Sequence, residues 1–273
     1  MIPKLLHYCW FGGNPLNDLA LKCIKSWETF LPDYQIIRWD ESNFDVMSCA
    51  YTREAYLAKK WAFVSDYARF WILYHHGGLY FDTDVEVLRP LDDIIARGAF
   101  MGCEKYALPT PHQVHPGLGL GVAPGLGLGV APGLEVYKEI MADYEKSHFL
   151  NPDGSMNLQN NVVTRTTAVL VRHGLKNINK IQDVAGVYIY PKEYFSPKDV
   201  ETHQLEITSN TYTIHHYDAS WAEWYDKAAD TRGIKLRKIF GNKLGNEINV
   251  CIYTWQKEGF SGFAKKIRKR LKK

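Results

Sequence analysis

The first forty residues combine short apolar runs with one amphipathic stretch, and this order restricts the fold. Residues 5–11 form an apolar run that ends at two glycines, which predicts a buried strand. Apolar residues recur at helical spacing over 16–30, with Asn14 as the expected cap and Pro15 in the first turn. Residues 34–39 then predict a second strand. A strand, a helix and a strand in this order predict a parallel sheet with helices on both faces.

A second group of signals leads to an acidic pair. Apolar residues follow the helical period over 61–76, and Gly77-Gly78 ends this helix. The run Leu79-Tyr80-Phe81 predicts a short strand that continues directly into Asp82-Thr83-Asp84. Ligands of open α/β sheets gather at the carboxyl ends of strands. The sequence therefore predicts a functional site at this acidic pair.

Asp-x-Asp alone is a weak motif, because it is short and an acidic turn explains it equally well. Position strengthens it, since alternate residues at the end of a strand point the same way. Asp82 and Asp84 can therefore face one ion. Oxygen ligands suit Mg²⁺ or Mn²⁺, which also bind phosphates. A cation held there can neutralise a diphosphate leaving group.

Two further segments carry polar residues in apolar surroundings. Asp66 and Arg69 are three residues apart on the helix over 61–76 and share one face. A surface ion pair is the simpler interpretation, but the apolar helix favours a position at a cleft, where the pair can bind sugar hydroxyls. Later, His215 and His216 follow an alternating stretch, and a neutral imidazole can complete a carboxylate metal site.

Three blocks of the chain resemble a known family. IPKLLHYCWFGG, FVSDYARFWILYHHGGLYFDTDVEV and IHHYDASW are similar to the DXD glycosyltransferases of the capsular-polysaccharide and initiating-mannosyltransferase type, glycosyltransferase family 32. The resemblance extends remotely to the glucosyltransferase domains of the large clostridial toxins. It implies an α/β fold of the GT-A class, with a Rossmann-like nucleotide-binding sheet over residues 1–230. Residues 231–273 are expected to form a basic, amphipathic helical appendage.

The resemblance also implies roles for the donor-binding residues. Trp10 would stack on the base of the nucleotide, and Asp66 and Arg69 would hold the donor sugar. Asp82 would contact the sugar or the ribose. Ser220-Trp221 would close over the diphosphate.

The metal ligands follow from the same resemblance. Asp84 would bind Mn²⁺, or Mg²⁺ in its place, and His215 would be a further ligand of the metal or of the diphosphate, in preference to His216. Asp82, Asp84, Asp66 and Arg69 form the expected catalytic set.

The implied reaction transfers a sugar with retention from a UDP-sugar to a growing capsular or surface polysaccharide, or to a lipid-linked oligosaccharide. A sugar-binding family member without catalysis is the first alternative. A metal-dependent phosphohydrolase is a weaker one, because that class requires Ser or Thr where Glu86 stands.

Charge and cysteine content limit the partners and the compartment. The net charge is +3, but the last nine residues carry seven positive charges, which leaves −4 for the rest and argues against nucleic acid. Five scattered cysteines predict neither disulfides nor a zinc site and fit a reducing cytoplasm. No signal peptide or membrane-spanning run is expected. The basic C-terminus, with an apolar stripe of Phe260, Phe263, Ile267 and Leu271, suits peripheral attachment to the inner face of an anionic membrane. A solvated terminal helix is the alternative.

An octapeptide repeat interrupts the middle of the chain. PGLGLGVA occupies 116–123 and is repeated immediately over 124–131. One copy is compatible with a strand and turn, and the second indicates a local duplication. We expect a bulged loop without a catalytic role, and distortion of the acceptor side by the second copy.

Overall fold

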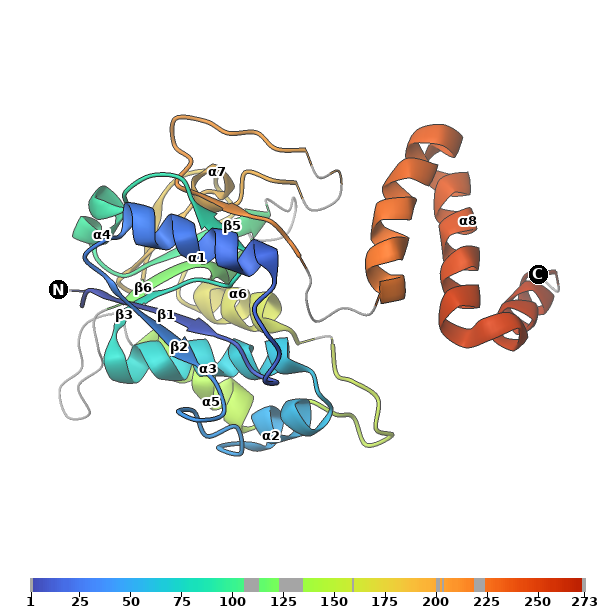
Figure 1. Cartoon of the computed structure of the whole chain (residues 1–273), viewed down its shortest axis with the longest axis horizontal. Coiled ribbons are helices and arrows are strands. Elements are labelled where there is room, and N and C mark those ends of the chain that lie inside the picture. Colours follow the sequence, from blue (N-terminus) through green and yellow to red (C-terminus); the bar gives the residue numbers. More distant parts are fainter. Residues whose placement is uncertain are drawn as a thin grey trace. The chain divides into compact units, whose positions relative to one another are not determined.

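The computed structural model describes residues 2–105, 113–122, 135–158, 160–199, 202, 204–218 and 224–271 (Figure 1). The chain divides into two compact units. The first contains Met1–Asp199 and Gln204–Tyr217, and the second contains Val200–His203 and Asp218–Lys273. Within the described parts of the chain, no helix is both long enough and apolar enough to span a bilayer.

The first unit is built on a seven-stranded sheet with the strand order β2-β1-β3-β6-β5-β8-β7, and a second sheet pairs β4 with β9. The strands are β1 Leu5–Cys9, β2 Gln35–Trp39, β3 Gly78–Tyr80, β4 Val85–Val87, β5 Phe100–Lys105, β6 Gln113–Val122, β7 Gln182–Val184, β8 Val187–Tyr190 and β9 Thr213–His215. Pairing is parallel for β1 with β2, β1 with β3 and β5 with β8. The sheet is mixed and not wholly parallel as predicted, because β6 runs antiparallel to both β3 and β5.

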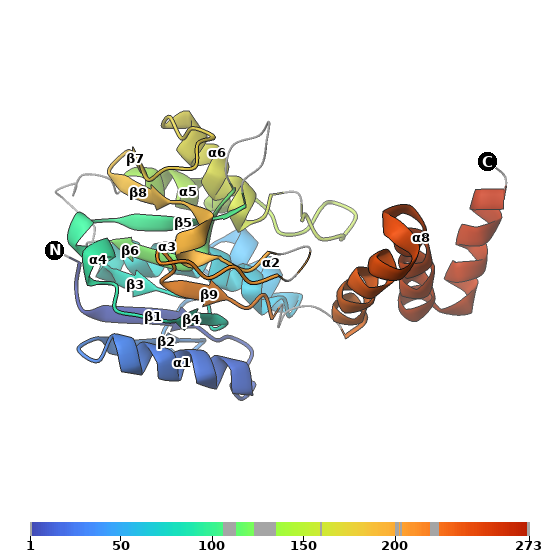
Figure 2. The same cartoon turned by 90° about the horizontal axis from the view of Figure 1, so that it is seen from above.

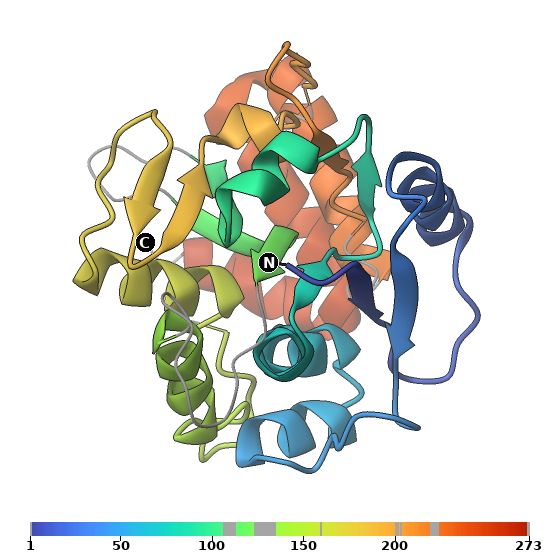
Figure 3. The same ribbon diagram turned by 90° about the vertical axis from the view of Figure 1, so that its left-hand side faces the viewer.

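Helices cover both faces of this sheet, as predicted (Figure 3). One face carries α3, α5 and α6, with α2 packed on α3, and the other carries α1, α4 and α7. The helices are α1 Asp18–Phe30, α2 Ala50–Leu57, α3 Trp61–His76, α4 Asp92–Arg97, α5 Glu135–Glu145, α6 Val162–Arg172 and α7 Lys192–Phe195. Each layer of helices packs against its face of the sheet through its own buried apolar cluster. Apolar packing on both faces therefore stabilises the sheet.

The predicted strand, helix and strand at the start of the chain are β1, α1 and β2, with parallel β1 and β2. The predicted cap was wrong. Asn17 caps α1, because its side-chain oxygen accepts a hydrogen bond from the backbone N–H of Ala20 at 2.8 Å. Asn14 and Pro15 precede the helix. The indole N–H of Trp27 donates to the carbonyl of Val85 at 2.8 Å and joins α1 to β4, which lie side by side in Figure 2.

Residues 182–190 form two short strands joined by a tight turn. β7 and β8 pair as an antiparallel hairpin. Ala185 and Gly186 connect them with φ of 51° and 79°. Two successive positive φ values are what a tight type I′ hairpin turn requires.

The first copy of the octapeptide repeat is part of the sheet, in agreement with the compatibility of one copy with a strand. Its residues 116–122 form most of β6, which lies between β3 and β5. Gly119 and Gly121 leave room for the rings of Phe195 and Phe100, since a Cβ atom at either glycine would lie within 3.0 Å of them. The second copy lies outside the described residues.

His7 on β1 is a buried, fully hydrogen-bonded imidazole. Its Nδ1 accepts from the indole N–H of Trp39 at 3.0 Å, so its Nε2–H donates to the carbonyl of Gly77 at 2.9 Å. Burial lowers the pKa of His7 to about 4. The neutral ring thus ties β1 to β2 and to the end of α3.

We expect His7 to make the first unit sensitive to acid. In the unfolded chain His7 titrates near its ordinary value, so the unfolded state binds an extra proton as the pH falls from about 6.5 towards 4, and stability decreases. A shift of this size corresponds to about 3 kcal/mol. Urea unfolding at pH 7 and at pH 4.5 should show most of this loss in the wild type, and much less in His7→Gln. The exposed His75→Gln is the matched control and should retain the wild-type difference; the same difference in His7→Gln would contradict the assignment.

Candidate active site

The acidic pair occupies the turn between β3 and β4. The backbone N–H of Asp82 donates to the carbonyl of Gly117 on β6 at 3.0 Å, and the N–H of Val85 donates to the carbonyl of Asp82 at 3.0 Å. β1 runs parallel to β3, so Trp10, which directly follows β1, lies at the same carboxyl-terminal edge of the sheet. The structure therefore places the pair where the sequence predicted it.

Arg69 links α3 to this turn. Its Nη2 lies 2.9 Å from Oδ1 of Asp66 and 3.2 Å from Oδ1 of Asp82, and its Nη1 donates to Oδ2 of Asp82 at 3.2 Å. Its Nε donates to the carbonyl of Ser65 at 3.0 Å. The guanidinium is 97% buried, which excludes the simpler interpretation of Asp66 and Arg69 as a surface ion pair. Three of the four residues of the expected catalytic set thus form one hydrogen-bonded group.

One buried cation between two carboxylates sets the electrostatics of this group. Burial raises the pKa of Asp66 to about 7, against the opposing effect of the Arg69 guanidinium. Burial alone would lower the pKa of Arg69, but Asp82 and its other neighbours raise it above the usual range. Arg69 therefore stays charged, while Asp66 can change its protonation state near neutral pH.

Tyr80 is a member of this group that the sequence did not identify. Its hydroxyl donates to Oδ1 of Asp82 at 3.1 Å, and the guanidinium carbon of Arg69 lies 5.0 Å from its ring centroid. The signal was the alternation along the strand, because residues two apart point to the same side. Tyr80 and Arg69 together engage both carboxylate oxygens of Asp82.

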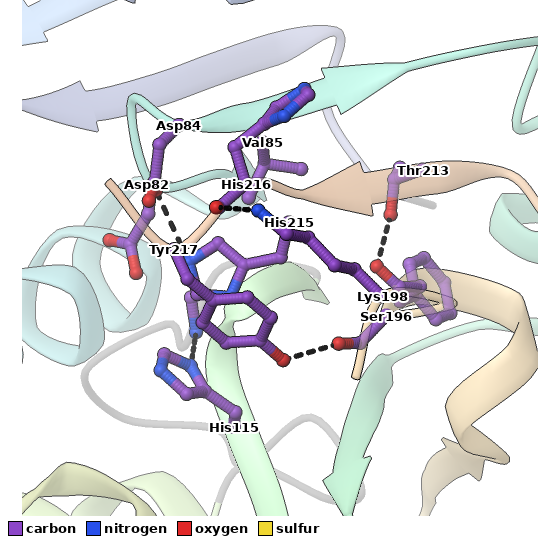
Figure 4. Close-up of polar contacts among 12 residues, drawn as sticks. Asp82, Asp84, Val85, His115, Ser196, Lys198, Thr213, His215, His216 and Tyr217 are labelled. Carbon is purple, nitrogen blue, oxygen red and sulfur yellow. Dashed lines mark hydrogen bonds and ion pairs between the residues drawn. The ribbon is translucent and has the colours of Figure 1, made fainter. Parts of the chain in front are cut away.

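The second aspartate faces a histidine on another strand. Val85 pairs with His215 across the antiparallel β4 and β9, and Nε2 of His215 lies 3.2 Å from Oδ1 of Asp84 (Figure 4). His216 points elsewhere, with its Nε2 2.8 Å from Oε2 of Glu86. The structure thus brings His215, and not His216, to the side chain of Asp84.

His215 sits among aromatic rings in a nearly closed environment. The rings of Tyr217 and His115 lie 4.1 Å and 5.3 Å from it, centroid to centroid. Burial disfavours the charged imidazole, but the charge and hydrogen bond of Asp84 outweigh burial and raise the pKa of His215. Its Nδ1 is buried and has no hydrogen-bond partner among the described residues.

Tyr217 closes this side of the site with a strained backbone. Its φ is 56°, which is unfavourable for a residue with a side chain and typical of functional sites. Its hydroxyl forms a 2.5 Å hydrogen bond with that of Ser196, a fully buried residue after α7 (Figure 4). The late block containing His215 predicted this region, but not Ser196, which comes from a distant part of the sequence.

Gly117 in the octapeptide repeat packs directly against the acidic pair. A Cβ atom at this position would lie 1.7 Å from Oδ2 of Asp82 and 2.8 Å from Nη1 of Arg69. Only glycine leaves room for the carboxylate there. The sequence interpretation gave the repeat no role, whereas the structure places its first copy against the site.

The residues present fit a divalent cation bound through few protein ligands. Asp84 and His215 offer a carboxylate and an imidazole, which suit Mn²⁺, and the unpartnered Nδ1 shows that the hydrogen bonds of His215 are incomplete. No group of three or more His, Cys, Asp and Glu side chains in the described ranges is arranged to hold a metal.

Two predicted contacts with the donor are not part of this constellation. The indole N–H of Trp10 donates to the backbone carbonyl of Asn14 at 2.7 Å, so the ring is fixed by the loop after β1. Ser220 and Trp221 lie outside the described residues. All five cysteines are free, as the sequence predicted.

Comparison with known proteins finds a family that is similar to one segment of this chain. Residues 17–101 match the glycosyltransferase sugar-binding region containing DXD motif. This segment includes Asp66, Arg69 and the acidic pair, whereas His215 lies beyond it.

Two curated relatives come from Schizosaccharomyces pombe. Inositol phosphoceramide mannosyltransferase 1 is 29% identical over 111 residues, which cover 37% of this chain and 33% of the relative. Inositol phosphoceramide mannosyltransferase 3 is 31% identical over 98 residues, which cover 34% and 27%. The chain thus spans about a third or less of the length of these relatives.

A solved structure, PaToxG Glycosyltransferase, superposes with a TM-score of 0.43 and 16% identity over 63% of this chain and 69% of that one. The family match contains the second of the three sequence blocks described above, FVSDYARFWILYHHGGLYFDTDVEV. Residues 17–101 therefore match the sugar-binding region of the DXD glycosyltransferases, which confirms the family resemblance that the motifs of this segment indicated.

Proposed function

We propose that this chain is a metal-dependent glycosyltransferase of the GT-A class that transfers a sugar, with retention, from a UDP-sugar. The observation that carries the proposal is the turn after β3, where Asp82 is held by buried Arg69 and Asp84 faces His215. This arrangement offers two neighbouring groups of side chains. The carboxylates of Asp66 and Asp82 can accept hydrogen bonds from hydroxyl groups, and Asp84 with His215 can bind a cation next to a diphosphate.

In this proposal the donor sugar binds at the Arg69 group. The carboxylates of Asp66 and Asp82 accept hydrogen bonds from sugar hydroxyls, and Arg69 keeps both in place. Trp10 stacks on the nucleotide base. Hydrogen bonds to carboxylates are stronger than those between neutral groups, particularly where water is excluded. Positioning the anomeric carbon is therefore the main contribution of this group.

Asp84 and His215 would hold Mn²⁺ or Mg²⁺ beside the diphosphate. The bound cation supplies charge neutralisation of the departing diphosphate. In the transfer, the bond between the anomeric carbon and the diphosphate oxygen breaks, and the acceptor oxygen bonds to the same face of that carbon. The acceptor proton passes to a diphosphate oxygen. Asp66 and Asp82, fixed by Arg69, orient the sugar for this exchange and need not take the proton.

We further propose a lipid-linked or growing surface glycan as the acceptor, used at the cytoplasmic face of a membrane. The names of both relatives specify a mannosyl group and a lipid acceptor, inositol phosphoceramide. The positively charged C-terminus supports the same location, since it suits an anionic surface. A donor panel should therefore include GDP-mannose beside several UDP-sugars.

We expect donor binding to depend on the metal. With Mn²⁺, one UDP-sugar should raise the unfolding temperature of the full chain, because a ligand of the native state stabilises it by mass action. Asp84→Asn should abolish the Mn²⁺-dependent part of this rise and lower sugar transfer by about 100-fold or more, since it removes the charge at nearly constant size. Thermal unfolding and the release of UDP measure the two effects.

Glu86→Gln is the matched control for this variant. Glu86 lies two residues further on and pairs with His216 and Lys22, away from Asp84. Glu86→Gln should retain the Mn²⁺-dependent rise in unfolding temperature. Full transfer by Asp84→Asn would refute the metal assignment. A shift with GDP-mannose alone would refute the UDP-sugar, and donor binding without product formation would indicate a sugar-binding protein.

Gly117 in the first copy of the octapeptide repeat provides a further test of the site. Gly117→Ala should displace the carboxylate of Asp82 from Arg69, abolish the donor-dependent shift and destabilise the first unit by about 1–3 kcal/mol through overpacking. Gly125→Ala changes the same position of the second copy and should behave as the wild type. Thermal unfolding with and without donor measures both. The reverse result would show that the second copy, and not the first, lies against Asp82.

A further inference from the structure

The second unit consists mainly of α8, Trp224–Leu271, which is divided by two glycines (Figure 1). Gly241 has φ and ψ of 76° and 166°, and Gly259 has 68° and −170°. Both conformations are incompatible with a continuing helix. The chain therefore turns at these positions and forms three helical segments, 224–240, 242–258 and 260–271.

Polar groups and a glycine join the first segment to the second. Arg232 donates to the side-chain oxygens of Asn249 and Gln256 at 2.9 Å and 3.0 Å. A Cβ atom at Gly245 would lie 2.6 Å from the carbonyl oxygen of Leu236, so the two backbones approach closely there. The contact between these segments thus depends on hydrogen bonds and close backbone packing.

Large apolar side chains of the same segments point outward. In a helical hairpin stabilised by water exclusion, apolar residues face the partner helix and polar residues face the solvent. Here five large apolar residues are about half exposed or more: Ile239 70%, Phe240 48%, Leu244 50%, Trp255 56% and Phe260 75%. These five side chains therefore remain exposed to solvent, while Arg232 and its two partners join the segments through polar contacts.

The exposed apolar residues gather at the two turns. Ile239, Phe240 and Leu244 flank Gly241, while Trp255 and Phe260 flank Gly259. Single exposed apolar residues are common on soluble proteins, but groups of them mark interaction sites. We call these two groups the apolar turns.

Charge indicates what covers the apolar turns. Residues 224–273 contain fourteen Lys and Arg against four Asp and Glu. A second copy of this unit would carry the same charge and be repelled. An anionic lipid membrane matches both the positive charge and the exposed apolar side chains. Basic side chains can reach the lipid phosphates while their apolar neighbours enter the headgroup region.

We infer that the second unit binds the surface of an anionic phospholipid membrane through the apolar turns, with its Lys and Arg residues on the lipid headgroups. The inference deepens the proposed function, on which its biological meaning rests, since it would bring the transferase to a lipid-linked acceptor. It identifies which residues make the attachment. The binding is peripheral, and each turn contributes apolar contact while the charge contributes attraction over a longer distance.

Vesicle flotation of the full chain tests this inference. Vesicles of phosphatidylcholine with about a third phosphatidylglycerol should carry the protein, pure phosphatidylcholine should carry little, and 0.5 M salt should weaken the binding. The triple variant Ile239→Ser, Phe240→Ser and Leu244→Ser should lower binding at least ten-fold, as should Trp255→Ser with Phe260→Ser. Because the substituted side chains are exposed, we expect these variants to remain folded, and thermal unfolding verifies this.

Leu21→Ser with Leu57→Ser is the matched control, because these leucines are exposed to a similar extent in the first unit. It should float like the wild type. Equal flotation with neutral vesicles, unchanged flotation of the triple variant, or equal loss in the control would each overturn the inference. So would sedimentation showing that the wild type self-associates through these residues and does not bind vesicles. The donor-dependent thermal shift is measured separately, so a missing shift with intact flotation would contradict the proposed transfer reaction alone.

Discussion

The site depends on one buried guanidinium. Arg69 contacts Asp66 on its own helix and both oxygens of Asp82 after β3, so a single side chain joins α3 to the carboxyl-terminal edge of the sheet. Because a charge deprived of its partner inside a protein costs about 3–5 kcal/mol, none of these three residues can be lost or moved independently. The position of Asp82 is therefore fixed by helix packing as well as by the turn that carries it.

On its opposite side, Asp82 packs against the backbone of Gly117, which has no side chain. Gly117 accepts a backbone hydrogen bond from Asp82 and leaves the space that its carboxylate occupies. Arg69 binds the carboxylate of Asp82 on one side, and the backbone of β6 restricts the position of this carboxylate on the other. The first copy of the repeat, for which the sequence predicted no catalytic role, thus forms one wall of the site. Its duplication matters for this reason, since each copy offers the same glycine at the same place in the octapeptide.

Much of the first unit could be predicted because its signals are local. Helical spacing identified α1 and α3, and the short apolar runs identified β1, β2 and β3, so the acidic pair was placed at the correct sheet edge. The mixed character of the sheet could not be predicted, because β6 is rich in glycine and its partners β3 and β5 are set by tertiary packing. The choice between His215 and His216 depended on the family resemblance, and only the register of β4 against β9 gives a physical reason for it. Asn14 and Asn17 are equally good caps in sequence, and the course of the loop after β1 decides between them.

The two units depart from ordinary folding preferences in opposite ways. The first buries a cation and two carboxylates where apolar residues would pack at less cost. The second exposes aromatic and aliphatic side chains and uses polar groups to join its helices. Local departures of this kind reduce stability, so they persist where another molecule compensates for them. A sugar with its diphosphate would satisfy the first unit and a lipid surface the second. Both departures therefore support the proposed roles, in which the first unit binds a sugar donor and the second unit binds a membrane surface.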